Sequence, residues 1–270
     1  MTSIAVTGAS GRMGQAIIRY AGENPATTVS AATEQAGHAL IGRDAGQGAG
    51  IDPIGVAISD QLAVVSAADV VIDFTFHTAV PAHVAAAREA GKAFVLGTTG
   101  LTDEETAAVH AAAEVIPVIW APNMSLGMNL LFAMVKQAAA GLSEAYDIEI
   151  METHHRHKQD APSGTALGLA ENAAAGRGVD LEAVADYGRH GMTGERVPGR
   201  IGIHAIRGGD IVGDHTVMFA TDGERLELTH RASSRDTFAM GAIKAAQWAP
   251  GKPAGLYNMQ DVLGITPAGG

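Results

Sequence analysis

Val6-Thr7-Gly8-Ala9-Ser10-Gly11-Arg12-Met13-Gly14 decides the fold, because its three glycines have GxxGxxG spacing, a variant of the dinucleotide fingerprint GxGxxG. Gly8 allows a tight turn, Gly11 lets the backbone approach a pyrophosphate, and Gly14 lets the next helix pack on a sheet. The turn lies between an expected strand at 4–6 and an expected helix at 11–21, so the pyrophosphate would lie at a helix N-terminus. The spacing predicts a nucleotide site, and a plain glycine-rich turn is the alternative.

An acid follows the second expected strand, Val29–Ala32. Glu34 lies 20 residues after Gly14, where a carboxylate binds the ribose hydroxyls of a dinucleotide. An acid repels a 2′-phosphate, and the residue after it is Gln35, not a base. The pair therefore favours NADH over NADPH, although Arg12 is a base that can reach a phosphate. The expected cofactor is NADH, NADPH or both, with NADH favoured.

The rest of the first half alternates strands and helices. Strands are expected at 69–73, 93–96 and 118–120, and helices at about 79–90 and at 103–113, the second with Thr102 as its N-cap. This rhythm predicts an α/β fold with a Rossmann-like, doubly wound parallel sheet.

Two turns follow strands of this expected sheet, Gly97-Thr98-Thr99-Gly100 and Ala121-Pro122-Asn123-Met124. Ligands of open α/β sheets bind at the carboxyl ends of the strands. Both turns offer small residues and backbone donors to a nicotinamide ring, and each alone is equally consistent with a plain connection.

The pattern changes after Trp120 and predicts a smaller α+β domain with a mostly antiparallel sheet. The expected elements are helices at about 126–140 and 165–175, the second ended by Gly176, a long loop at about 181–198, and strands at 147–153, 201–207, 216–220 and 225–230. Asp222-Gly223 marks a hairpin turn within 221–224. An Ala-rich helix at 236–248 is expected to return to the first domain. The domains are thus 1–126 with 235–270, for the dinucleotide, and 127–234, for substrate and assembly.

Composition excludes several functions. The 270 residues carry a formal net charge of -11, which argues against nucleic-acid binding, and contain no cysteine, which excludes thiolate nucleophiles and disulfides. No apolar run approaches the roughly 20 residues of a membrane helix, and the N-terminus lacks the features of a signal peptide. The expected location is the cytoplasm, without membrane or nucleic-acid partners.

Cationic residues are concentrated in one stretch of this acidic chain, Glu152-Thr153-His154-His155-Arg156-His157-Lys158-Gln159-Asp160-Ala161-Pro162-Ser163-Gly164-Thr165. Five consecutive residues are cationic or can become so, and Pro-Ser-Gly-Thr begins a helix. A cationic cluster beside a helix N-terminus suits a small anion with more than one carboxylate or phosphate. A solvated basic loop with buried histidines is the plainer interpretation. The spacing is not HExxH, so no metal is expected.

These motifs, together with Asp73-Phe74-Thr75 and Arg207-Gly208-Gly209-Asp210, resemble the 4-hydroxy-tetrahydrodipicolinate reductase (dihydrodipicolinate reductase) family along nearly the whole chain. The resemblance implies a Rossmann-like cofactor domain and a smaller domain that binds a dicarboxylate cyclic imine and builds a homotetramer. Some members carry a base after the ribose acid, where this chain has Gln35.

The resemblance also implies roles for single residues. His154 matches the proton donor and Lys158 a second catalytic acid or base. His155, Gly164 and Thr165 match contacts to the substrate carboxylates, and Ser163 caps the helix or contacts the same carboxylate. The implied cofactor contacts are Gly8, Ala9, Ser10, Gly11, Arg12, Met13, Glu34, Gly97, Thr98, Thr99, Ala121, Pro122, Asn123 and Met124.

Two alternative functions remain open at this point. One is another NAD-dependent amino- or imino-acid reductase, such as an aspartate dehydrogenase. The other is a non-catalytic NAD(H) sensor, which would not need His154 as an acid.

Overall fold

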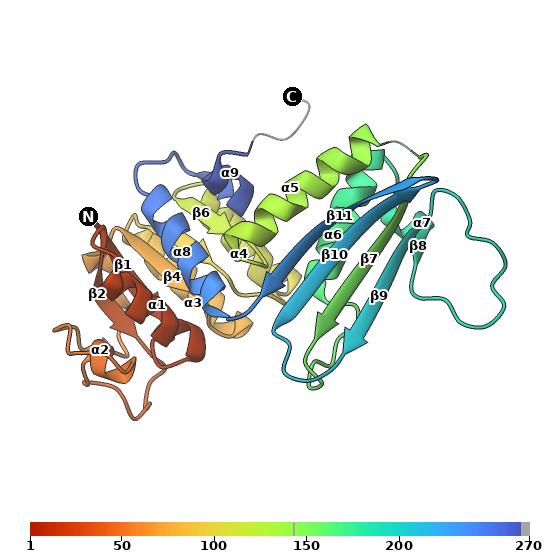
Figure 1. The fold of residues 1–270 in the computed structure, drawn as a ribbon. Helices are drawn as coiled ribbons and strands as arrows, with labels where there is room; N and C mark the ends of the chain where they lie inside the picture. Colours follow the sequence, from red (N-terminus) through yellow and green to blue (C-terminus); the bar gives the residue numbers. More distant parts are fainter. Residues whose placement is uncertain (143, 266–270) are drawn as a thin grey trace. The chain divides into compact units, whose positions relative to one another are not determined.

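The computed structural model describes residues 1–142 and 144–265 (Figure 1). Its contacts divide the chain into two compact units, residues 1–126 with 236–264 and residues 127–235. Residues 266–270, which the sequence assigned to the first domain, lie outside the described residues. Among the described residues, no helix combines the length and apolar character needed to cross a membrane.

The first unit is built on a parallel sheet of seven strands in the order β12-β6-β5-β4-β1-β2-β3. The strands are β1 (Thr2–Thr7), β2 (Thr27–Thr33), β3 (Ile58–Ser59), β4 (Val70–Asp73), β5 (Ala93–Leu96), β6 (Pro117–Trp120) and β12 (Gly255–Tyr257). The order reverses between β1 and β4, which makes their carboxyl ends a topological switch point.

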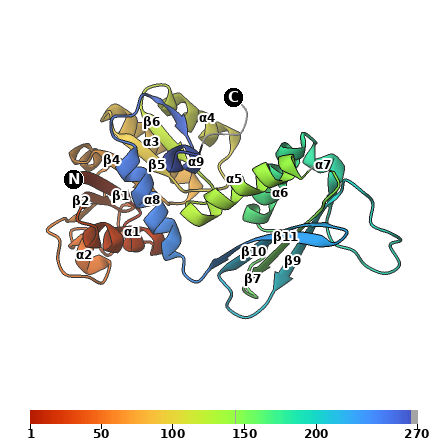
Figure 2. The same cartoon turned by 45° about the horizontal axis from the view of Figure 1, so that its top comes forward.

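Helices cover both faces of this sheet, as Figure 2 shows. On one face, α1 (Arg12–Glu23), α8 (Asp236–Trp248) and α9 (Met259–Leu263) share an apolar core with side chains of β1, β4 and β5. On the other face, α3 (Val80–Glu89) and α4 (Asp103–Ala113) form a second core. The remaining elements of the unit are α2 (Ala45–Gly48), η1 (Leu62–Ala67) and η2 (His77–Ala79). The expected doubly wound α/β fold is therefore confirmed.

Local chemistry explains where helices begin. Thr102 accepts the backbone N–H of Glu105, whose side chain accepts the N–H of Thr102, so the predicted cap of α4 is a complete capping box. Strands β3 and β12 were not predicted, because strands of two and three residues carry too little periodicity to be recognised.

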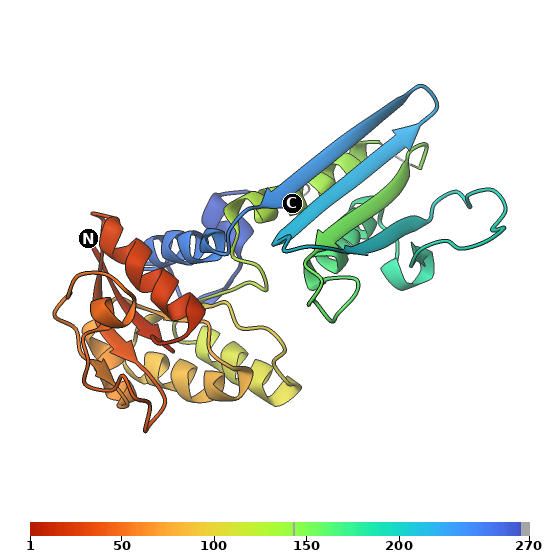
Figure 3. The ribbon, with the colours of Figure 1, turned by 60° about the horizontal axis from the view of Figure 1, so that its bottom comes forward.

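The second unit is a mixed sheet in the order β11-β10-β7-β9-β8. Its strands are β7 (Asp147–His154), β8 (Ala185–Asp186), β9 (Ile201–Arg207), β10 (Gly213–Thr221) and β11 (Glu224–Ala232). The long pairs β10–β11 and β7–β10 are antiparallel, whereas β9 runs parallel to β7 and β8. Helices α5 (Leu126–Gly141) and α6 (Gly164–Arg177) pack along one face, as Figures 1 and 3 show.

The structure corrects two expectations in this unit. Helix α6 does not end at Gly176 but continues to Arg177 and ends at Gly178, which has the left-handed φ of 67°. Gly176 is a packing position, since a Cβ there would lie 2.3 Å from the carbonyl oxygen of Lys136. The expected loop at 181–198 begins instead with α7 (Leu181–Val184) and β8.

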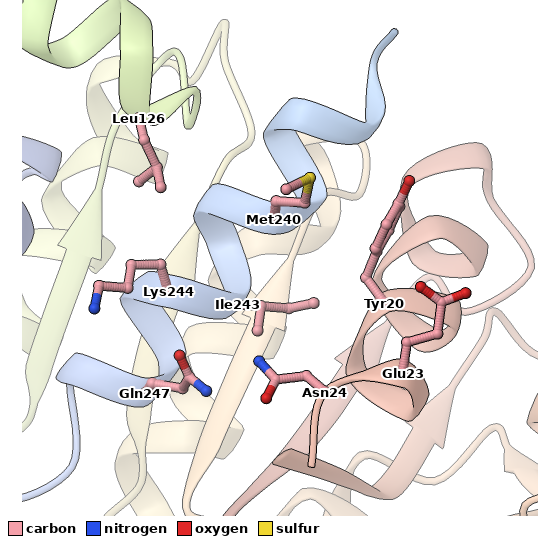
Figure 4. A pocket seen from close by; sticks show the side chains of 8 residues that line it. All are labelled: Tyr20, Glu23, Asn24, Leu126, Met240, Ile243, Lys244 and Gln247. Carbon is pink, nitrogen blue, oxygen red and sulfur yellow. The ribbon is translucent and has the colours of Figure 1, made fainter. Parts of the chain in front are cut away.

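A shallow hollow of about 340 Å³ lies between α1 and α8 of the first unit (Figure 4). Leu126, Met240 and Ile243 are among its apolar lining residues, and Glu23 and Lys244 among its charged ones. Its α1 residues come from the C-terminal end of that helix. Because α1 runs back along the sheet, the hollow lies away from the carboxyl ends of the strands, where ligands of such sheets bind.

Candidate active site

The glycine turn lies at the switch point between β1 and β4. Gly8 has a φ of 63°, and a Cβ there would lie 2.8 Å from the Thr75 side chain. A Cβ on Gly14 would lie 2.2 Å from the carbonyl oxygen of Gly8, so α1 packs closely on the turn. Gly11 is the N-cap of α1 and has no side chain to cover the helix N-terminus. A turn with these features is of the kind that receives a pyrophosphate in dinucleotide-binding sheets.

A hollow of about 620 Å³ opens at these strand ends, where open α/β sheets bind their ligands. Gly8, Gly11, Glu34, Thr75 and His83 are among its lining residues. None of the described residues that line it is lysine or arginine, and Asp60 adds a second acid to Glu34. Of the other predicted contacts in the turn, Ala9 is buried, Ser10 and Met13 are half-buried, and Arg12 is exposed.

Glu34 also supports the turn itself. Its two carboxylate oxygens accept the backbone N–H groups of Ser10 at 3.0 Å and of Gln35 at 2.9 Å. The ribose acid expected from the sequence is therefore tied to the glycine turn, so both keep a fixed spacing.

A buried carboxylate ties the neighbouring strand ends together. Asp73 accepts the backbone N–H and hydroxyl of Thr75, the hydroxyl of Thr98 at 3.2 Å, and lies 2.6 Å from His83 Nδ1. Burial alone raises the pKa of Asp73, but the bonds from His83 and Thr75 outweigh it and hold that pKa low. Trp120 Nε1 donates to the Thr98 carbonyl, which extends the chain of bonds to β6.

The two predicted nicotinamide turns are partly structural. Gly97 is required for packing, because a Cβ there would lie 2.2 Å from the Phe74 ring. The Thr98 side chain points inward to Asp73, whereas Thr99 is exposed. In the second turn Ala121 and Met124 are buried, Asn123 Oδ1 accepts the backbone N–H of Ser125, and Pro122 is exposed. The side chains of Ala121 and Met124 therefore face the core, and these two residues can offer a cofactor only backbone groups.

In the second unit, strand register assembles the cationic cluster. Glu152 and His154 are two apart on β7 and face the same side of the sheet. His215 of β10 lies opposite Glu152, and Arg207 of β9 lies opposite His154. Residues far apart in the sequence thus meet on one face, beside the N-terminus of α6.

Glu152 is fully buried and is the centre of this cluster. Oε2 lies 2.6 Å from His154 Nδ1 and accepts Arg207 Nη1 at 2.8 Å, while Oε1 accepts Arg207 Nη2 at 2.8 Å and the Ser163 N–H at 3.0 Å. Burial by itself raises the pKa of Glu152, but these bonds outweigh it and hold the pKa below its usual value. The carboxylate is therefore ionised at neutral pH.

His154 is packed between neighbouring groups. Its ring meets that of His215 edge-on with centroids 5.1 Å apart. A Cβ on Gly213 would lie 3.0 Å from His154 Nε2, so that nitrogen lies against a position without a side chain. His215 is 4% exposed, and burial, followed by the charge on His154, lowers its pKa to about 4. His215 is consequently neutral at neutral pH.

The start of α6 is built as the sequence suggested. Ser163 is the N-cap, and its hydroxyl accepts the N–H of Ala166 at 3.2 Å and lies 3.3 Å from His215 Nε2. Gly164 and Thr165 open the helix, the first exposed and the second half-buried. Their N–H groups belong to the first helical turn, which lacks internal acceptors and attracts anions.

The remaining predicted residues lie beyond β7. In the described part of the chain, His155 Nδ1 is buried without a hydrogen-bond partner. Burial, and then the charges of Arg235 and His157, lower the pKa of His155. Lys158 donates to Asp160 at 2.9 Å. His157, whose ring centroid lies 6.2 Å from that of His155, is exposed. In the tautomer with a proton on Nδ1, a bound carboxylate would supply an acceptor to His155.

Glu152, Arg207 and His215 received no role from the sequence. Glu152 and His154 have the two-residue spacing of one strand face, a signal that was available. Arg207 was noted as part of a motif. His215 was missed because the expected strand began at 216, whereas β10 begins at Gly213.

Two models of one protein family match the two halves of the chain. The model "Dihydrodipicolinate reductase, N-terminus" matches residues 2–124, and "Dihydrodipicolinate reductase, C-terminus" matches residues 127–263. The chain belongs to the dihydrodipicolinate reductase family. The resemblance inferred from the motifs is thereby confirmed, as are the enzyme class, an oxidoreductase, and its use of a nicotinamide cofactor.

The relatives match nearly the whole chain. The 4-hydroxy-tetrahydrodipicolinate reductase of Anaeromyxobacter dehalogenans is 53% identical over 266 residues, with 98% of each chain covered. That of Hahella chejuensis is 52% identical over 98% of this chain and 100% of its own. The solved structure of dipicolinate-bound dihydrodipicolinate reductase from Paenisporosarcina sp. TG-14 is 25% identical, has a TM-score of 0.76, and covers 97% and 98% of the two chains.

Proposed function

We propose that the chain reduces 4-hydroxy-2,3,4,5-tetrahydrodipicolinate to 2,3,4,5-tetrahydrodipicolinate, with loss of water, in lysine biosynthesis via diaminopimelate. The observation that carries the proposal is the buried His154 beside the start of α6, in a chain that also has a dinucleotide cradle. Family membership supports the choice of substrate.

In this proposal each unit binds a different ligand. The unit 1–126 with 236–264 binds the dinucleotide, and the unit 127–235 binds substrate. Gly8 to Met13, Glu34, Gly97 to Thr99 and Ala121 to Met124 hold the cofactor, which supplies a hydride to ring carbon 4. Glu34 orients the adenosine ribose, and Asp73 keeps the strand-end turns at fixed spacing.

His154 performs the proton transfer. After water is lost, reduction of the conjugated ring at carbon 4 leaves an enamine, which needs a proton at carbon 3. Imidazole delivers a proton near neutral pH more readily than any other unperturbed side chain. The Nε2 side of His154, against Gly213, is the side away from Glu152 and is assigned this delivery.

The substrate carboxylates are bound by His155, Lys158 and the N–H groups of Gly164 and Thr165, with Ser163 as the helix cap. The buried, unpartnered Nδ1 of His155 supports this assignment, since such an atom gains a bond when an anion arrives. Lys158 exchanges its exposed partner Asp160, 62% exposed at the side chain, at little cost. Lys158 also assists proton relay.

NADH is the preferred cofactor in this proposal. Glu34 and Asp60 both line the hollow, and their charges repel a 2′-phosphate. Replacement Glu34→Gln should raise the NADPH to NADH ratio of kcat/KM by about tenfold, which corresponds to roughly 1.4 kcal/mol.

The second unit also builds a homotetramer. Its sheet has helices on one face, and on the opposite face the side chain of Ile206 is 52% exposed. An open sheet face with exposed apolar side chains suits association with further copies of the chain. Sedimentation at micromolar concentration tests this, since a monomer would contradict it.

The first experiment is steady-state oxidation of NADH and NADPH with and without the cyclic substrate generated by its synthase. Substrate-dependent turnover is expected. His154→Gln should lower kcat by about 10²- to 10³-fold and leave nucleotide binding intact. His204→Gln, which removes another histidine bound to a glutamate in the same sheet, is the matched control. Full activity of His154→Gln would remove His154 as the donor, and nucleotide binding without turnover would favour a sensor.

A further inference from the structure

Glu152 accepts hydrogen bonds from four donor atoms with its two oxygens, and two of these atoms belong to His154 and Ser163 of the proposed reaction site. His154 Nδ1 and Arg207 Nη1 meet Oε2 at 2.6 and 2.8 Å. Arg207 Nη2 and the Ser163 N–H meet Oε1 at 2.8 and 3.0 Å. The two-point contact of Arg207 fixes the plane of the carboxylate and leaves each oxygen one further donor.

This arrangement determines the tautomer of His154. An ionised carboxylate can only accept a hydrogen bond, so the Nδ1 of His154 must carry a proton. Nε2 is then the nitrogen that gains and loses a proton during turnover. The same oxygens fix the backbone of Ser163, the cap of the helix that is proposed to bind a carboxylate.

A second face of His154 is also fixed. His215 meets the ring edge-on, and its Nε2 lies 3.3 Å from the Ser163 hydroxyl. The proton donor and the helix cap are thus linked twice, through Glu152 and through His215. A shift of either group moves the other.

We propose that Glu152 is the positioning residue of the proton donor. Its single carboxylate sets the tautomer and the ring orientation of His154 and holds that ring at a fixed place relative to the N-terminus of α6. The inference rests on the proposed function, in which His154 donates the proton, and assigns to Glu152 no contact with the substrate.

The test is Glu152→Gln with Glu149→Gln as its matched control. All four partner atoms of Glu152 are donors, two on each oxygen, so an amide of the same shape must point its NH₂ group at two of them, one of which belongs to Arg207. Glu149 is a second buried glutamate of β7 bound by arginine and histidine, but its partners exclude His154. Glu152→Gln should lower kcat about 30- to 100-fold with the KM for NADH unchanged, and Glu149→Gln less than threefold.

A double-mutant cycle separates positioning from folding. If Glu152 acts through His154, Glu152→Gln should cause no more than a twofold further loss of kcat in the His154→Gln background. An undiminished loss in that background would overturn the inference while leaving His154 as the donor. Full activity of His154→Gln alone would instead overturn the proposed function.

The native protein provides a measurement that does not depend on the variant folding. Nitrogen-15 shifts of the His154 ring should show a protonated Nδ1 and a bare Nε2 above the pH at which the ring is cationic. Glu152→Asp, which keeps the charge, should retain this pattern and recover activity at least threefold over Glu152→Gln. A native His154 with a bare Nδ1 would overturn the inference.

Discussion

Glu149 and Glu152 are two carboxylates of one strand with nearly the same chemistry and different consequences. Both are buried in β7 and bound by arginine and histidine. They are three residues apart, so they face opposite sides of the sheet. Glu149 meets Arg189 and Arg196 from the segment after β8 and His204 of β9. It therefore fastens a surface segment to the sheet.

Glu152 faces the side covered by helices and binds the N-cap of α6 and His154. Both glutamates have lowered pKa values, so a perturbed pKa does not tell them apart. The hydrogen-bond partners of a buried carboxylate therefore decide its role. The partners of Glu149 are partly exposed arginine and histidine side chains. Those of Glu152 include His154 and the N-cap of α6, which belong to the proposed reaction site.

The largest difference between the two sites is expected when one arginine is removed from each. Arg207→Met leaves the fully buried Glu152 without its cation and should destabilise the chain by about 3 kcal/mol and lower kcat at least tenfold. Arg189→Met leaves Glu149 with Arg196 and His204 and should cost about 1 kcal/mol with kcat retained. Urea unfolding and steady-state assays check both, and equal losses would break the comparison.

Acid titration should reveal the Glu149 site. Arg189, His204 and Arg196 outweigh burial and lower the pKa of Glu149 from 4.5 to about 2. A lowered carboxyl pKa stabilises the fold above pH 4.5, and that stability is lost as the pH falls toward 2. The full contribution at neutral pH is up to about 3 kcal/mol. The unfolding free energy of Glu149→Gln should be flatter than wild type in this window, and parallel curves would contradict the assignment.

On the face of the sheet that holds Glu152, His215 should make stability depend on pH in a higher range. Burial and the neighbouring His154 lower the pKa of His215 from 6.5 to about 4. Between these values the unfolded chain binds more protons than the folded chain, so stability falls as the pH drops from 6.5 to 4. His215→Gln should reduce this slope and remove about 2 kcal/mol of the loss. Melting temperatures across the window test it, and an unchanged slope would exclude His215 as the cause.

The smallest effect tests how closely the His154 ring is held. A methyl group at Gly213 would lie 3.0 Å from His154 Nε2, so Gly213→Ala should shift the ring by a few tenths of an ångström and lower kcat about threefold. Gly208→Ala is the control, because a Cβ there meets nothing within 4 Å. A loss of activity in both variants would point to the β9–β10 connection and not to the ring.

Particular elements show how far the sequence could be interpreted. The glycine turn and the alternation of strands and helices identify the doubly wound sheet, because turn geometry and burial on both faces impose local patterns. Gly176 and Gly178 look equally suited to end a helix. Gly178 ends it because Gly176 is enclosed by Lys136 and Ala139 from α5, a contact that no local pattern records.

By itself, the sequence determined the nucleotide-binding fold, the family and the cationic stretch that contains His154, because each depends on motifs of residues close together in the chain. Tertiary structure alone decided that Glu152 accepts from Arg207, 55 residues away, and that His215 lies against His154. Strand register brings these groups together, and register depends on the packing of the whole sheet. The sequence gives the type of each residue, whereas the pairing of Glu152 with Arg207 and of His154 with His215 requires the folded sheet.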